Sequence, residues 1–337
     1  MLNDIRQSHL ISWLNRIFST ENIMLSAMNG DAGFRRYFRF NYNNQSYVAV
    51  DAPKHWCNNN AFIDMQRALK STGIVVPEII AKDDEHGFFC LSDLGDTLLS
   101  DIVTKDNMAN FYQQAINLLP TISSLPNDNL PKFTESFIQI ELNIFVEWLL
   151  DKHLSIELST GEQQQLNQCF SLLVANALAQ PQVTMHRDFH SRNIMQISNE
   201  TLAVIDFQDA VEGPITYDIV SLLRDCYLKW PHTNVLELLD HFIQLQTTHH
   251  NLTGISAKQW RTWFDLMGLQ RHIKASGIFA RLYHRDNKAN YLHDIPLTLS
   301  YIVDISRQYD DLSFLGELVT EKVLPKLALL SVEECDE

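Results

Sequence analysis

Apolar and polar residues alternate along several short stretches near the start of the chain. This alternation is typical of half-buried strands, and turn residues separate the stretches. It predicts strands at 23–27, 34–40, 45–51, 75–81 and 87–91. Helical spacing of apolar residues predicts a helix at 3–18 and another at 60–72, which ends at Gly73. The connections are short, so we expect a small lobe built on an antiparallel sheet.

Beyond residue 95, apolar residues recur mainly at helical spacing. The pattern predicts helices at 107–119, 136–153, 161–179, 217–229, 233–247, 257–283, 296–309 and 313–330. The proline-bearing stretch 119–131 is expected to be a loop. We therefore predict a bilobal α+β fold, with a small sheet lobe at 1–91, a hinge at 92–95 and a larger, mainly helical lobe at 96–337.

One hairpin interrupts the helical lobe. Two apolar runs, 194–197 and 202–205, flank the turn residues 198–201, and a short strand at 183–185 precedes them. In the simplest register Ile197 faces Leu202 and Ile194 faces Ile205. One step further, Asn193 lies opposite Asp206. Cross-strand neighbours lie about 5 Å apart, so an amide and a carboxylate are expected to meet at one end of this hairpin.

The residues at this end suit phosphoryl transfer, which depends on positioning and charge neutralisation. We predict that Asn193 and Asp206 are Mg²⁺ ligands, because this ion prefers oxygen donors. Asp188, five residues before Asn193, is predicted to be the catalytic base that accepts the proton of the attacking hydroxyl. His186-Arg187-Asp188, then Asn193, then Asp206-Phe207 form the catalytic signature of kinases.

The tripeptide His-Arg-Asp occurs a second time, at 284–286. The residue five positions after Asp286 is Tyr291, and no apolar hairpin ending in Asp-Phe follows. We therefore interpret this copy as a polar helix end, with a substrate contact as the alternative.

Composition narrows the class of protein. The 337 residues carry a net charge of −15, which argues against nucleic acid or an anionic membrane as a partner. No signal peptide or membrane-spanning run is expected, and the odd number of cysteines, five, lies scattered without a Cys-x-x-Cys pair. We expect a cytoplasmic protein with reduced thiols and a small-molecule substrate, while the oligomeric state stays open.

A glycine turn lies between the first two predicted strands. Backbone N–H groups of Gly30 and Gly33 could approach phosphate oxygens, although an ordinary hairpin turn explains them equally well. Arg35, Arg36 and Arg39 follow, and we predict that at least one of them binds the nucleotide, with Arg36 and Arg39 as the candidates. Arg35 shares a strand face with Arg39 whereas Arg36 lies on the other face, so both sets cannot face the nucleotide.

Kinases place a lysine on the next strand, but 47–53 has none. Lys54 or Arg39 could replace it, with Asp64 as an acidic partner or as a solvated helix residue. Asp93, in the predicted hinge, is expected to line the nucleotide site.

With these residues together, the chain resembles the aminoglycoside phosphotransferase and choline kinase group of the protein-kinase-like superfamily. Within it, the chain is similar to a subgroup of anomeric kinases that phosphorylate N-acetylmuramate and N-acetylglucosamine at C1 in cell-wall recycling. The matching segments are 33–39, 50–53, 186–193, 205–218, 277–282, 285–286 and 291–292. The resemblance implies ATP, Mg²⁺ and a sugar acceptor, with Asp188 as base and Asn193 and Asp206 as metal ligands.

A sugar site needs hydrogen-bonding groups near the base. We predict Arg192, Gln208, Asp209 and, on the helix at 136–153, Glu141 as sugar-binding residues. Trp148 on the same helix is better explained by core packing.

Two other functions stay open. An aminoglycoside phosphotransferase would use an acidic cleft, which the net charge permits. A pseudokinase binding module fits the absent lysine, but the intact Asp188, Asn193 and Asp206 argue against it.

Overall fold

The computed structural model describes residues 2–28, 33–199 and 201–333. It divides into two compact units: residues 1–99 with 193–209 form the first, and residues 100–192 with 210–337 form the second. The hairpin that carries the predicted metal ligands thus belongs to the same compact unit as the sheet, although it comes much later in the chain. The lobe boundaries at 1–91, 92–95 and 96–337 stay a prediction.

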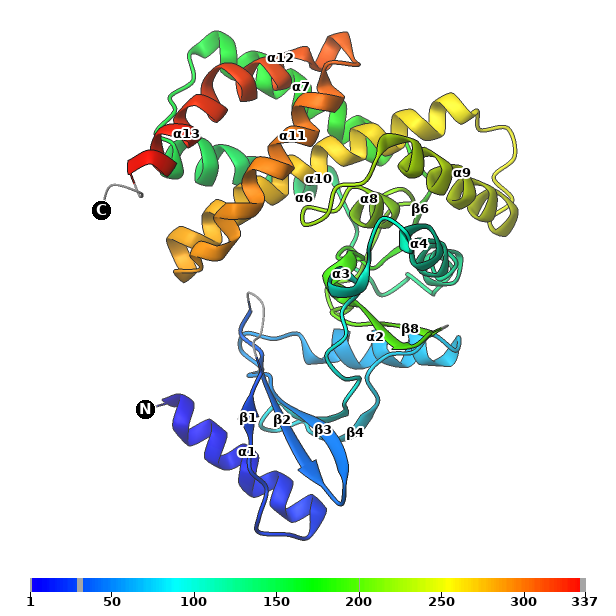
Figure 1. Cartoon of the computed structure of the whole chain (residues 1–337), viewed down its shortest axis with the longest axis vertical. Coiled ribbons are helices and arrows are strands. Elements are labelled where there is room, and N and C mark those ends of the chain that lie inside the picture. The colour runs from blue at the N-terminus through cyan, green and yellow to red at the C-terminus, as the bar shows by residue number, and fades with distance from the viewer. Residues whose placement is uncertain (1, 29–32, 200, 334–337) are drawn as a thin grey trace. The chain divides into compact units, whose positions relative to one another are not determined.

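The first unit is built on a five-stranded antiparallel sheet with the strand order β1-β2-β3-β5-β4 (Figure 1). The same unit also contains a separate two-stranded hairpin, β7-β8, which comes later in the chain. The elements are α1 (Leu2–Phe18), β1 (Ser26–Ala27), β2 (Arg36–Tyr42), β3 (Gln45–Asp51), α2 (Asn59–Ser71), β4 (Ile79–Asp83), β5 (Phe88–Ser92), β7 (Ile194–Ser198) and β8 (Thr201–Val204).

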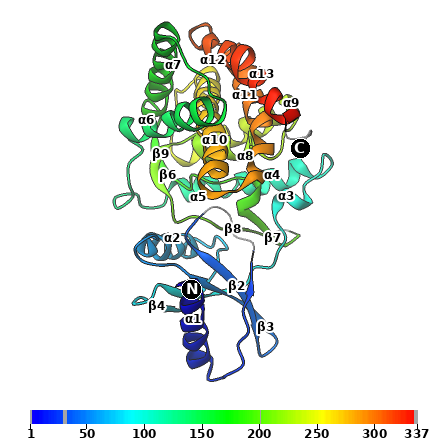
Figure 2. The ribbon, with the colours of Figure 1, turned by 90° about the vertical axis from the view of Figure 1, so that its left-hand side faces the viewer.

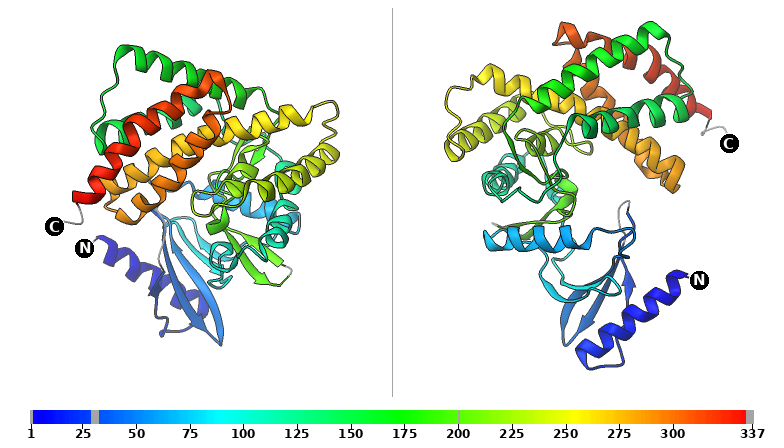
Figure 3. Two further views of the ribbon diagram at one scale, coloured as in Figure 1. Left: turned by 45° about the horizontal axis from the view of Figure 1, so that its top comes forward. Right: turned by 180° about the vertical axis from the view of Figure 1, so that it is seen from behind.

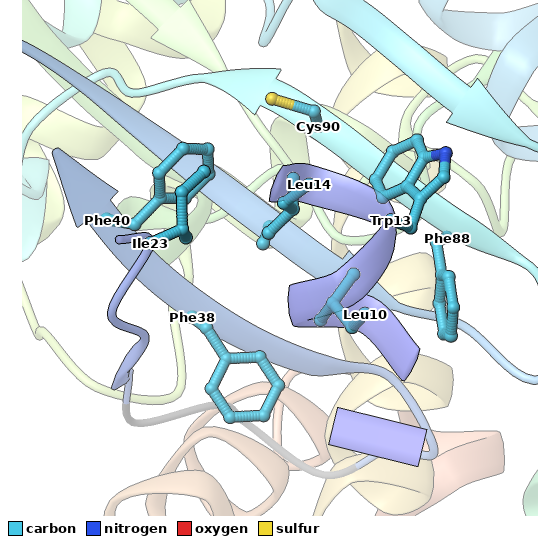
Figure 4. Packing of buried hydrophobic residues seen from close by; sticks show 9 residues of the cluster. Leu10, Trp13, Leu14, Ile23, Phe38, Phe40, Phe88 and Cys90 are labelled. Atoms are coloured by element: carbon cyan, nitrogen blue, oxygen red, sulfur yellow. The ribbon is translucent and has the colours of Figure 1, made fainter. Parts of the chain in front are cut away.

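The two helices of this unit cover opposite faces of the sheet. On one face, side chains of α1 pack against alternate residues of the strands (Figure 4), among them Leu10, Trp13, Leu14, Phe38, Phe40 and Phe88. On the other face, Phe62 of α2 packs edge-on against Phe89 of β5, with ring centroids 5.4 Å apart. The alternation of strand side chains therefore assigns each residue of β2 and β3 to the α1 face or the α2 face.

The hairpin β7-β8 differs from its predicted register by one residue. Ile194 pairs with Val204 and Gln196 with Leu202, and the register shifts between Gln196 and Ser198. This irregularity inserts Ile197 without a partner, and its side chain is exposed. Such a bulge adds one residue to one strand only, which an apolar pattern does not reveal.

The second unit is mainly helical, and the long helix α10 packs against many of the others (Figures 2 and 3). Its only sheet is the pair β6-β9, counted over the described residues. The elements are α3 (Leu99–Ile102, whose first residue belongs to the first unit), α4 (Met108–Ile116), α5 (Leu119–Ser123), α6 (Glu135–Ile144), α7 (Thr160–Leu178), β6 (Gln182–Met185), β9 (Val211–Pro214), α8 (Tyr217–Leu223), α9 (His232–His249), α10 (Ala257–Asp286), α11 (Ile295–Ser306), α12 (Ser313–Leu318) and α13 (Leu324–Glu333), with π-helical turns at Phe145–His153 and Val319–Val323.

Two predictions about this unit need correction. The stretch 119–131 is not all loop, because it begins with α5. The helix predicted at 217–229 stops at Leu223, where Arg224 leaves helical geometry with φ −121° and ψ 53°. Arg224 is buried and donates to Asp265, so tertiary pairing overrides local helix propensity here.

Cys57, Cys90, Cys169 and Cys226 are free thiols, whereas Cys335 lies outside the described residues. Within the described ranges, no helix combines the length and the apolar character needed to cross a membrane.

A buried histidine should make stability depend on pH. His272 of α10 is fully buried, its Nε2 lies 2.8 Å from the Arg224 carbonyl oxygen, and its ring stacks on Tyr301. Burial lowers the pKa of His272 to about 3. An unfolded histidine titrates near about 6.5, so below that pH the unfolded state binds a proton that the folded state does not.

The contribution of His272 is therefore complete above pH ~6.5 and is lost as the pH falls towards about 3, by about 1.4 kcal/mol per pH unit. Urea unfolding at pH 7 and pH 5 measures this loss. His272→Gln should reduce the difference between the two free energies of unfolding by about 2 kcal/mol. An unchanged difference would contradict the assignment.

Candidate active site

The loop that carries Asp188 begins where β6 ends, and an aspartate fixes its backbone. The N–H groups of His186 and Arg187 donate to the two carboxylate oxygens of Asp218, at 2.7 and 2.9 Å. Arg187 has φ +79°, a left-handed conformation that costs free energy for a residue with a side chain. Asp218, in the first turn of α8, therefore stabilises a strained turn directly before Asp188.

A second aspartate fixes the other end of the loop. Asp225 accepts hydrogen bonds from the N–H of Ser191, at 3.0 Å, and from its hydroxyl. The other oxygen of Asp225 accepts from the N–H of Tyr227. Asp225 can reach the loop because α8 stops at Leu223, two residues before it. The helix break therefore contributes directly to the shape of the loop that carries Asp188.

A buried ion network includes the residue next to Asp188. Glu141 is only 3% exposed and accepts from Arg187 at 2.7 Å and Gln270 at 2.9 Å. The ammonium of Lys274 lies 3.0 Å from Glu141 and donates to the hydroxyl of Tyr217 at 3.0 Å. Burial lowers the pKa of Lys274, but Glu141, Tyr217 and Asp188 together outweigh this effect and raise it. This geometry favours a positioning role for Glu141 over the predicted sugar contact.

The network keeps Asp188 ionised. Burial alone would raise the pKa of its carboxyl, but the charges of Lys274, His190 and Arg187 lower it to about 2. Asp188 is thus a carboxylate at neutral pH, able to accept a hydrogen bond from a hydroxyl group.

The predicted metal ligands meet at the end of the hairpin in the first unit. Nδ2 of Asn193 lies 3.4 Å from Oδ2 of Asp206, and the N–H of Ile205 donates to the carbonyl oxygen of Asn193 at 3.0 Å. The bulge shifts the pairing at this end, so that Asn193 lies opposite Ile205 and not Asp206, yet the side chains of Asn193 and Asp206 remain neighbours.

Asp206 is held in an unusual conformation at an exposed position. Its φ is +63°, and Nε2 of Gln208 donates to its Oδ1 at 2.7 Å. The next residue, Phe207, is buried and stacks on Phe62 of α2, with centroids 5.2 Å apart. Strained non-glycine residues are concentrated at functional sites, and here a buried ring on one side holds the strain.

The donor set fits magnesium. Mg²⁺ usually takes one or two protein oxygens and completes its octahedron with water and substrate phosphates. Asn193 and Asp206 offer an amide and a carboxylate, and rotation of the Asn193 amide would present its oxygen. Throughout the described ranges, no group of three or more His, Cys, Asp or Glu side chains is arranged to hold a metal ion.

Arg36 lies on the α1 face of the sheet. It pairs across strands with Asp51, a fully buried residue that also binds Arg6 of α1. Tyr37, the next residue of β2, points to the opposite face of the sheet. Burial and then the negative charge of Asp206 raise the pKa of Tyr37 to about 12, so Asp206 lies on the Tyr37 side. The geometry therefore favours an anchoring role for Arg36, which ties α1 to the sheet, over the predicted nucleotide contact.

Arg39 and Asp93 come together on β2 and in the predicted hinge. Nε of Arg39 donates to Asp93 at 2.6 Å, and Ser46 and the N–H of Gly95 donate to the same carboxylate. Their contact with a nucleotide stays a prediction. A Cβ on Gly33 would meet only a backbone nitrogen at 4.0 Å, so no steric demand for glycine exists there. Gly30 lies outside the described residues.

The family model that matches residues 25–255 is described as the phosphotransferase enzyme family. This match spans more than half of the sequence and includes Asp188, Asn193 and Asp206. The chain belongs to the phosphotransferase enzyme family. Its members transfer phosphoryl groups, so the predicted enzyme class is confirmed.

Curated relatives extend over nearly the whole chain. The chain is 37% identical over 331 residues to the N-acetylmuramate/N-acetylglucosamine kinase of Pseudomonas putida, which covers 95% of this chain and 97% of the relative. It is 34% identical to the kinase of the same name from Neisseria meningitidis, covering 94% and 96%.

Solved structures of the family share the fold. A choline kinase from Streptococcus pneumoniae matches with a TM-score of 0.62 and 15% identity, covering 87% of this chain and 98% of the other. The ADP-bound aminoglycoside phosphotransferase APH(2'')-Ib matches with a TM-score of 0.57 and 14% identity, covering 87% and 97%. The predicted α+β, protein-kinase-like fold is confirmed.

The site also contains residues that the sequence interpretation did not assign. Asp218 and Asp225 fix the loop that carries Asp188, and Gln270 and Lys274 bind Glu141, the partner of Arg187 in that loop. A signal was present, because Asp218 and Lys274 interrupt apolar helical stretches, and a charge in a buried helix face needs a partner. The second His-Arg-Asp copy ends α10, where Asp286 pairs with Arg285, as predicted for a polar helix end.

Proposed function

We propose that the chain is an ATP- and Mg²⁺-dependent kinase that phosphorylates the anomeric C1 hydroxyl of N-acetylmuramate and N-acetylglucosamine. The observation that carries this proposal is the match over 95% of the chain to a curated kinase named for these two sugars. The intact Asp188, Asn193 and Asp206 support an active enzyme. Such an enzyme would act in the cytoplasm on peptidoglycan-derived sugars, with ATP and the sugar as its partners.

In the proposed reaction Asp188 orients the anomeric hydroxyl and accepts its proton. The anomeric oxygen bonds to the γ-phosphorus while the bond from that phosphorus to the ADP oxygen breaks. An anomeric hydroxyl is more acidic than an ordinary alcohol, so a weakly basic carboxylate suffices as the base. Asn193 and Asp206 would hold magnesium, which neutralises phosphate charge when bound.

A panel of acceptors tests the assignment. With ATP and Mg²⁺, N-acetylmuramate and N-acetylglucosamine should be turned over, and kanamycin should not. Phosphorus–proton coupling to the anomeric proton in the NMR spectrum should identify a 1-phosphate. A 6-phosphate, or a phosphorylated antibiotic, would reject the sugar assignment while leaving the kinase class intact.

A further inference from the structure

Arg192 presents a guanidinium group whose hydrogen-bonding edge binds no other side chain or backbone group among the described residues. Its side chain is 36% exposed, and its Cζ lies 3.6 Å from the centroid of the Tyr227 ring. Its nearest acidic atom is Oδ2 of Asp294 at 3.8 Å, beyond hydrogen-bond length. Among the residues that the structure describes, Arg192 donates no hydrogen bond.

The surroundings fix the Tyr227 ring on which this guanidinium lies. The ring of Tyr227 contacts His190 edge-on, with centroids 5.3 Å apart, and packs against Phe279 of α10. The preceding residue, Ser191, is fixed by Asp225. A planar fork stacked on a fixed ring is pre-organised, so little side-chain entropy is lost when it binds a ligand. Such a fork binds a carboxylate or a phosphate through two parallel hydrogen bonds.

The two proposed sugars differ in such a group. N-acetylmuramate carries a lactyl ether with a carboxylate at C3, and N-acetylglucosamine carries a hydroxyl there. C3 is separated from the reacting C1 by a single ring carbon, so the residue that binds its substituent must lie near the base. Arg192 follows Asp188 by four residues in the same unit.

We propose that Arg192 binds the lactyl carboxylate of N-acetylmuramate and so sets the preference between the two sugars. This inference rests on the proposed function. The fork offers two parallel N–H donors to the two carboxylate oxygens. Asp294, partly buried, balances the charge of Arg192 at a distance and leaves these donors available. The chain as a whole is strongly acidic, so an anionic sugar needs a local cation of this kind.

The ratio of kcat/KM for N-acetylmuramate to kcat/KM for N-acetylglucosamine measures this role. In Arg192→Gln the ratio should fall roughly 10- to 100-fold, mainly through the KM of N-acetylmuramate. Arg192→Lys keeps the charge but loses the fork, and should give an intermediate ratio. Arg285→Gln is the matched control, because Arg285 is an exposed arginine of the same unit paired with Asp286, and its ratio should not change.

A modified substrate tests the same contact without any change to the fold. With the unaltered protein, the methyl ester of the lactyl group should lose about as much kcat/KM as the Arg192→Gln variant loses with the free acid. In the variant, the ester and the acid should be turned over almost equally.

Equal losses for both sugars in Arg192→Gln would show that Arg192 only supports the loop, and would overturn the inference. An unchanged ratio, or an ester as good as the acid with the unaltered protein, would also overturn it. If the unaltered protein phosphorylates neither sugar, the proposed function itself fails, which is a different result.

Discussion

Replacing Asp188 by asparagine should lower kcat by about 10³-fold, within the 10²–10⁴-fold range typical of a general base. Asparagine has nearly the same shape, and the backbone hydrogen bonds that Asp218 and Asp225 accept on either side do not involve the replaced side chain. The amide cannot accept the hydroxyl proton, so the loss should appear in kcat, while the KM for ATP changes little. Steady-state kinetics with the sugar acceptor measures both.

The second His-Arg-Asp copy supplies an internal control. Asp286→Asn changes the same residue type in the same tripeptide, but at the end of α10, where Asp286 pairs with Arg285. It should retain most of the activity. Comparable losses in the two variants would mean that the first loop does not act as the catalytic loop.

The sheet of the first unit follows from its sequence closely. The predicted strand 45–51 is observed as β3 over the same residues, because its apolar alternation and its bounding turns agree. The antiparallel pairing of the hairpin that carries Asn193 and Asp206 was also predictable. Its register was not, because a bulge at Ile197 changes the pairing without changing the apolar pattern.

Contacts between distant segments could not be derived in the same way. Glu141 was predicted to bind sugar because it can accept hydrogen bonds and shares a helix face with Trp148. Within the protein it pairs with Arg187, Gln270 and Lys274, which lie 46, 129 and 133 residues away along the chain. A single sequence shows that such a charge needs a partner but does not show which one.

The face of a strand, by contrast, was predictable even where the role was not. Alternation correctly separated Arg36 from Arg39, which then pair with different acids, Asp51 and Asp93. The surroundings of each face depend on where α1 and the hairpin β7-β8 pack. Both are tertiary contacts, so β2 alone could not show which acid each arginine binds.

Asp206→Asn should lower kcat by about 10³-fold or more, because one carboxylate ligand supplies several kcal/mol through the metal. Asparagine tolerates the positive φ of Asp206, so the backbone should keep its conformation. A metal role predicts that the Mg²⁺ concentration for half-maximal activity rises and that Mn²⁺ binding with ATP, followed by electron paramagnetic resonance, weakens. Asp84→Asn is the control, since Asp84 is an exposed aspartate of the same unit that pairs with Lys82, and it should change neither quantity. If Asp206→Asn lost turnover while binding Mn²⁺ as tightly as the unaltered protein, Asp206 would not be a metal ligand, and the comparison with the unaffected Asp84 variant would point instead to a role in shaping the turn.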